Sequence, residues 1–79
     1  MLSENLREQV YKNTMEMVSL NQLLDNAKRE FEDAHNGDRP DFAKLSIISS
    51  KMAILFHKME TVFVEHERLQ KEIEKELFE

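Results

Sequence analysis

Apolar residues recur along residues 4–35 at alternating spacings of three and four. This spacing is typical of the seam of a coiled coil, in which one stripe of each helix faces its partner. Ser3 can cap the start of this helix, and Glu4 suits the positive end of the helix dipole. We therefore expect a first helix over about 4–35. Its two seam columns are Leu6, Asn13, Leu20, Ala27 and Ala34, and Val10, Met17, Leu24 and Phe31.

A second helix is expected over about 40–77, with a broader apolar surface. Its seam columns are Ile48, Leu55, Val62 and Leu69, and Leu45, Met52, Met59, His66 and Ile73. A third column beside them holds Phe42, Phe56, Phe63 and Leu77, while Ile47 and Ile54 lie on the opposite flank. One partner helix covers only a narrow seam. The second helix should therefore pack against at least two helices.

The segment between the two helices holds the only glycine and the only proline of the chain, Gly37 and Pro40. We expect a turn at 36–39, with Gly37 in the left-handed conformation that closes a helix. Asp38 would then cap the second helix, with Pro40 and Asp41 inside its first turn. The predicted fold is all-α. It is a coiled-coil-like, antiparallel two-helix hairpin and a single domain over 1–79, which completes a four-helix bundle by dimerisation or with a partner.

The columns also predict how the helices align. Pairs whose residue numbers sum to 72 bring Val10 opposite Val62 and Ala27 opposite Leu45. The same alignment brings Glu16 near Lys58, and Glu30 likewise near Lys44. Each exposed ion pair contributes only about 0–1 kcal/mol, but together such pairs favour one alignment over others.

Composition and charge limit the classes of partner. The chain has 79 residues, no cysteine and a formal net charge of −5. Nucleic acid and anionic membranes both attract basic surfaces, so neither is an expected partner. The first four residues lack the basic and apolar regions of a signal peptide, and no disulfide is possible, so we expect a cytoplasmic protein. Residues 65–77 are mostly charged, which fits either a fraying helix end or a segment of a longer helix.

The sequence carries no motif for catalysis, and we expect neither an enzyme nor a cofactor. A di-iron site in a helix bundle would need Glu-x-x-His pairs, but Ile54 and Phe63 stand three residues before His57 and His66. His66 falls in the seam and is expected to be half-exposed. We therefore expect no metal site.

The expected function is protein–protein association. The candidate interface residues are Phe42, Ile47, Ile54, Phe56 and Phe63, together with a second stripe formed by Tyr11, Met15 and Val18. Exposed apolar patches of this kind rarely persist on monomers. We expect an adaptor or assembly subunit that forms a two-fold homodimer or a hetero-complex. Two alternatives remain open: an export or assembly chaperone that shelters a client helix, and a coiled-coil finger that binds a GTPase.

Overall fold

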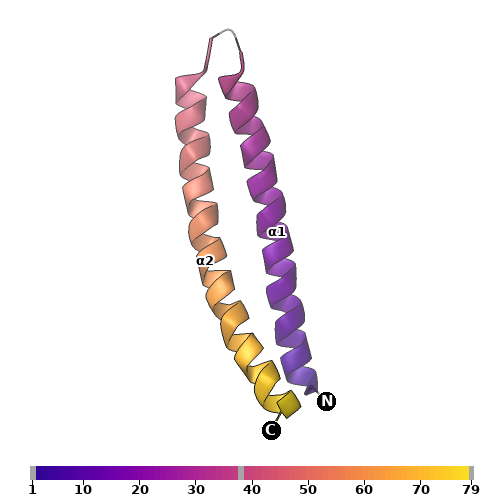
Figure 1. Cartoon of the computed structure of the whole chain (residues 1–79). Coiled ribbons are helices and arrows are strands. Elements are labelled where there is room, and N and C mark those ends of the chain that lie inside the picture. Colours follow the sequence, from indigo (N-terminus) through magenta and orange to yellow (C-terminus); the bar gives the residue numbers. More distant parts are fainter. Residues whose placement is uncertain (1, 38, 79) are drawn as a thin grey trace.

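The computed structural model describes residues 2–37 and 39–78, which form two α-helices. Helix α1 spans Glu4–His35 and helix α2 spans Phe42–Phe78. The two run antiparallel and pack along their lengths, so the predicted all-α, two-helix hairpin is confirmed (Figure 1). The molecule is a rod of 60 × 16 × 15 Å.

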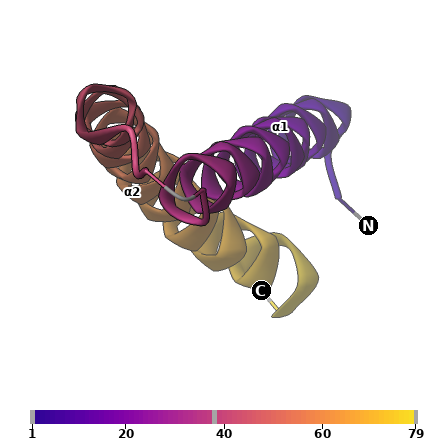
Figure 2. The same ribbon diagram turned by 90° about the horizontal axis from the view of Figure 1, so that it is seen from above.

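The helices coil about each other. Seen from above, the line that joins them rotates between the turn and the open end (Figure 2). A seven-residue apolar repeat on a helix of 3.6 residues per turn requires such coiling, because the stripe would otherwise drift away from the partner. At the open end, the Ser3 backbone N–H donates to the Glu76 carboxylate, with a nitrogen–oxygen distance of 2.8 Å.

Both ends of α1 are closed by hydrogen bonds. The Ser3 hydroxyl accepts from the Leu6 backbone N–H at 3.2 Å, so the predicted N-cap is confirmed. At the other end, the Asn36 N–H donates to the Glu32 carbonyl at 2.9 Å. Asn36 has φ −84° and ψ 5°, a conformation that any residue can adopt in a turn. The helix therefore ends without a left-handed residue.

The prediction for Gly37 is wrong, because Gly37 does not have a positive φ, nor does any other residue in 2–37 and 39–78. A Cβ atom added to Gly37 would meet only the Arg39 backbone, at 3.9 and 4.0 Å. These are ordinary van der Waals distances. The glycine is therefore not required by the backbone conformation of this turn.

The predicted start of the second helix is also corrected. The expected cap, Asp38, lies outside the described residues. The Asp41 carboxylate accepts from the Lys44 N–H at 3.0 Å, so Asp41 caps α2 and Pro40 precedes the helix instead of lying in its first turn. The Asp41 N–H donates to the Ala34 carbonyl at 3.3 Å and ties the start of α2 to the end of α1.

The core is the seam between the helices. On each helix, every member of one column is buried. Burying each large aliphatic side chain contributes roughly 1.5–3 kcal/mol. The second columns lie at the edge of the core, and only Leu24 and Met59 among them are buried. The fully buried columns are Leu6, Asn13, Leu20, Ala27 and Ala34 on α1, and Ile48, Leu55, Val62 and Leu69 on α2.

The predicted alignment of the two helices is wrong by three residues. The Asn13 side chain donates to the Val62 carbonyl at 3.1 Å, so Val62 lies opposite Asn13 and not opposite Val10. The residue numbers of this pair sum to 75. So do those of Ala34 and Asp41, which are joined by a backbone hydrogen bond near the turn. Seven-residue steps from Asn13 and Val62 pair the two buried columns with each other. These pairs are Leu6 with Leu69, Leu20 with Leu55, and Ala27 with Ile48.

The charge pairs used to choose the predicted alignment do not form. Within 2–37 and 39–78, the three ion pairs all lie inside α2, and none joins the helices. Exposed lysine–glutamate pairs are too weak to oppose the burial of a seam. A buried amide that needs an acceptor is a stronger constraint, because leaving it unpaired costs about 1–3 kcal/mol.

The backbone of the turn predicts the effect of changing its glycine. Gly37→Ala should leave the unfolding free energy unchanged or raise it by about 0.4–1 kcal/mol, because alanine restricts the unfolded chain at no cost to the turn. Urea denaturation followed by circular dichroism measures the difference. A loss of more than about 1 kcal/mol would instead indicate a left-handed residue.

The alignment can be tested by cross-linking, since the chain has no native cysteine. The double variant Ala27→Cys/Ile48→Cys should form an intramolecular disulfide readily under mild oxidation, because these residues face each other. The matched control is Ala27→Cys/Leu45→Cys, the pair from the alternative alignment. Mass spectrometry of the monomer band separates the two, and faster closure of the control pair would contradict the alignment described here.

Candidate interaction surfaces

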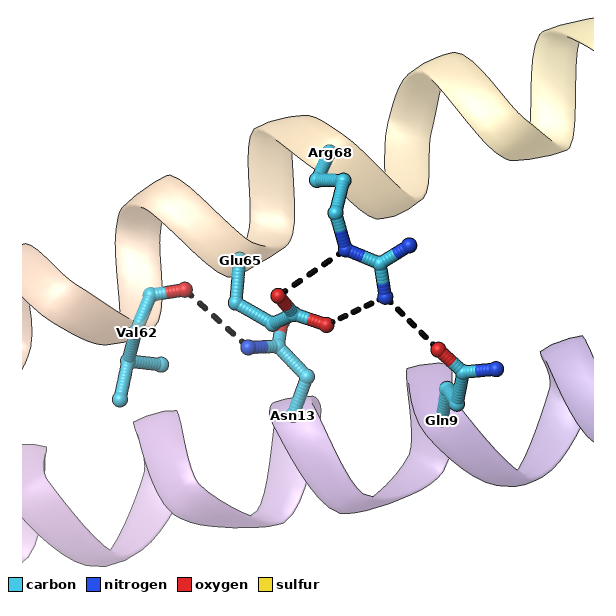
Figure 3. A network of polar contacts seen from close by, with 5 residues as sticks. All are labelled: Gln9, Asn13, Val62, Glu65 and Arg68. Atoms are coloured by element: carbon cyan, nitrogen blue, oxygen red, sulfur yellow. Dashed lines mark hydrogen bonds and ion pairs between the residues drawn. The ribbon is translucent and has the colours of Figure 1, made fainter.

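Polar side chains join the helices at two adjacent points in the half near the open end (Figure 3). Asn13 is the only buried polar residue in the described chain, with 5% of its surface exposed. One helical turn nearer the open end, the Arg68 Nη2 donates to the Gln9 Oε1 at 2.7 Å. These two contacts favour one alignment of the helices, as a polar residue in a seam does.

Arg68 is held in place by Glu65. The guanidinium donates to the carboxylate through Nε at 3.1 Å and through Nη2 at 2.6 Å. The hydrogen bond with Arg68 lowers the pKa of Glu65 and raises the pKa of Arg68, with a smaller opposing effect of burial on each. Any stability that this pair contributes is therefore present at neutral pH and is lost as the pH falls through the lowered pKa of Glu65.

The polar cluster holds one carboxylate, that of Glu65. In the ranges 2–37 and 39–78, no group of three or more acidic or histidine side chains is placed to hold a metal ion. His66 is half-buried in the seam. Over the same residues, neither helix has both the length and the apolar character needed to cross a membrane. The notable surfaces are apolar ones.

Three exposed phenylalanines of the candidate interface lie on one line along α2. Phe42, Phe56 and Phe63 expose 76%, 49% and 49% of their surfaces, and we call these three the phenylalanine row. They lie at multiples of seven residues, beside the partly buried Met52 column. About half of the surface of Phe56 and Phe63, and about three quarters of that of Phe42, can therefore be covered by something other than α1.

A hollow of about 420 Å³ lies at Phe56, where the row meets α1. Small side chains on α2 leave this space open, and Phe31 of α1 forms part of its wall. The lining residues are Lys28, Phe31, Glu32, Ser49, Met52, Ala53 and Phe56. We call this side of the hairpin the phenylalanine side.

A second, larger groove of about 620 Å³ runs between the helices farther from the turn. Its apolar lining residues are Tyr11, Met15, Leu20 and Val62, and two lysines and a glutamate line it as well. The full set is Tyr11, Lys12, Met15, Glu16, Ser19, Leu20, His57, Lys58, Thr61 and Val62. We call it the lysine-edged groove.

The structure separates the candidate interface residues into different surfaces. Tyr11 and Met15 line the lysine-edged groove, and Val18 is exposed beside them on α1. Ile54 and Ile47 are exposed on α2, and Ile54 lies one and two turns from Lys58 and Thr61 of the same groove. All eight candidate residues are therefore exposed, but they do not form one patch.

Sequence reasoning missed several residues of these surfaces. Phe31 and Met52 were assigned to the seam, yet both also line the hollow beside Phe56. Lys12 was not considered, although it lines the groove together with Lys58. The spacing along α1 could have identified Lys12, because Lys12 lies two helical turns from Ser19 and therefore on the same face of the helix.

Comparison of the chain with family models, with curated proteins and with solved structures finds no match in any of the three.

Replacing the buried amide should change the specificity of helix pairing more than its strength. Asn13→Leu removes the bond to Val62, whose carbonyl can still accept within α2, and places an apolar side chain in the seam. We expect an unchanged or higher melting temperature, and a smaller difference in closure rate between the Ala27→Cys/Ile48→Cys and Ala27→Cys/Leu45→Cys pairs. An unchanged difference would show that Asn13 does not set the alignment.

Proposed function

We propose that this chain is a non-enzymatic protein–protein interaction module. It acts as a helical-hairpin adaptor or assembly subunit and associates through the apolar surface of α2. The observation that carries this proposal is the exposure of the phenylalanine row in a hairpin whose seam is already complete.

The contact between α1 and α2 leaves the phenylalanine row uncovered. Helix α1 buries one stripe of α2, and its own fully buried column includes two alanines, Ala27 and Ala34. Full burial of a phenylalanine side chain contributes roughly 1.5–3 kcal/mol, and most of that gain is unused in Phe42. An interaction partner that covers the row would supply this stabilisation.

A second copy of the chain is the simplest partner. Domains of this size are short of buried surface, and association commonly supplies what the single chain lacks. Two hairpins that pack through α2 make a four-helix bundle, an arrangement in which each helix contacts two neighbours. Such an assembly accounts for the breadth of the apolar surface of α2.

Self-association makes stability depend on concentration. A tenfold increase in protein concentration should stabilise a dimer by about 1.4 kcal/mol and raise the melting temperature by several degrees. The double variant Phe56→Ser/Phe63→Ser should run as a monomer and lose this dependence. Light scattering after size-exclusion chromatography and thermal melts over a hundredfold concentration range measure both.

Val64→Ser is the matched control, since Val64 is also exposed but lies outside the row. It should associate like the unmodified chain. A stable monomer with a concentration-independent melt would contradict self-association. The row would then serve a different protein, as it would in a chaperone that shelters a client helix or in a GTPase-binding finger.

A further inference from the structure

The phenylalanine row and the lysine-edged groove lie on opposite sides of the hairpin. On α2 the row follows the Ile48–Leu55–Val62 column by one position, whereas Lys44, Lys51 and Lys58 precede the Leu45–Met52–Met59 column by one position. Steps in opposite directions from the seam lead to opposite sides of a helix. The hollow at Phe56 and the groove at Lys58 accordingly share no lining residue.

The phenylalanine side is acidic. Glu60 lies one helical turn from both Phe56 and Phe63, and Glu67 lies one turn beyond Phe63. On α1, Glu32 and Lys28 flank the hollow. Seven-residue steps from these positions add Arg7, Glu4, Asp25 and Glu74 to the same side, so six carboxylates against two basic groups give a formal charge of −4. Two copies that meet through this side would bring like charges together, which opposes association.

The groove side is basic, although the chain as a whole carries −5. Lys12 and Lys58 line the groove with Glu16 as the only carboxylate among its lining residues. The same edge continues toward the turn with Lys44 and Lys51 on α2 and with Glu30 and Asp33 on α1. Toward the open end it continues with the Glu65–Arg68 pair. Five basic groups against four carboxylates give a formal charge of +1.

The apolar features of the two sides are also complementary. The row projects large aromatic side chains, while the groove is a depression of about 620 Å³ with Met15 in its wall. Methionine adapts its shape to an incoming aromatic side chain and makes favourable sulfur–aromatic contacts. A projecting acidic aromatic surface therefore fits this basic groove better than it fits a copy of itself.

We propose a specific mode of association between two copies of the chain, and this proposal rests on the proposed function. Phe56 and Phe63 of the phenylalanine row of one copy dock in the lysine-edged groove of a second copy. The hairpins thus associate through two different surfaces, and not through a two-fold axis that pairs the row with itself.

The dimensions of the rod allow such a contact. One side of the hairpin measures 60 Å by about 15 Å, or about 900 Å². A stable interface buries about 800 Å² on each partner, so the two hairpins must overlap along most of their length. Because each copy keeps one free row or one free groove, the contact can repeat, and assemblies larger than a dimer should form as concentration rises.

Two variants, each with one surface removed, test this mode. The row variant is Phe56→Ser/Phe63→Ser, and the groove variant is Lys12→Glu/Lys58→Glu. Each is studied alone and in an equimolar mixture by analytical ultracentrifugation and native mass spectrometry, with circular dichroism to verify that the helices remain. Arg29→Glu/Lys71→Glu is the control for the groove variant, because it makes the same change in charge outside the groove.

Each variant alone should be monomeric, because it lacks one of the two surfaces. The mixture should give a one-to-one heterodimer, in which the row of the groove variant occupies the groove of the row variant. The control should assemble like the unmodified chain. No heterodimer in the mixture would overturn the proposal.

Other outcomes separate this inference from the proposed function. If the groove variant alone forms a dimer and the row variant does not, the row pairs with itself: the proposed function stands and the docking mode fails. If the row variant associates on its own, the row is not the interface and both fail. A monomeric unmodified chain at high micromolar concentration would overturn the docking mode and leave the row to a different protein.

Discussion

The apolar seam between α1 and α2 is the interaction on which every other feature of this protein depends. Two helices side by side can bury only one stripe each, so the seam fixes which residues face inward and leaves the remaining surfaces to water. The buried columns also fix where the outer residues lie around the rod. The exposed aromatic side chains of α2 and the lysines on its other edge are both placed by the same seven-residue repeat.

The fold was largely predictable because burial follows the repeat directly. The columns that contain Leu20 and Leu55 were assigned to the seam from spacing alone, and both are buried. The cap at Ser3 was predictable because its signal is local. The alignment of the two helices was not predictable in this way, because it depends on contacts between residues far apart in the sequence. The exposed charges favoured the alignment in which paired residue numbers sum to 72. The hydrogen bond from the buried Asn13 amide to the Val62 carbonyl forms in the alignment in which they sum to 75.

The surfaces were predictable only in part. Spacing identified Phe56 and Phe63 as exposed, because they lie beside the seam, and they are half-exposed. The groove was not predictable, since it is formed by residues from both helices and depends on their alignment. An error of three residues in alignment moves every cross-helix neighbour by about 4.5 Å, which is enough to separate Lys58 from its true surroundings.

The turn has a consequence for how sequence can change at this end of the rod. Gly37 is in a conformation open to other residues, and the bond from Asp41 to Ala34 closes the loop at its base. The packing of the helices therefore does not depend on which residues form the loop. Extra residues or a short epitope inserted after Gly37 should be tolerated, since exposed loop tips accept insertions readily. The inserted segment would be displayed at the opposite pole of the 60 Å rod from Ser3 and Glu76.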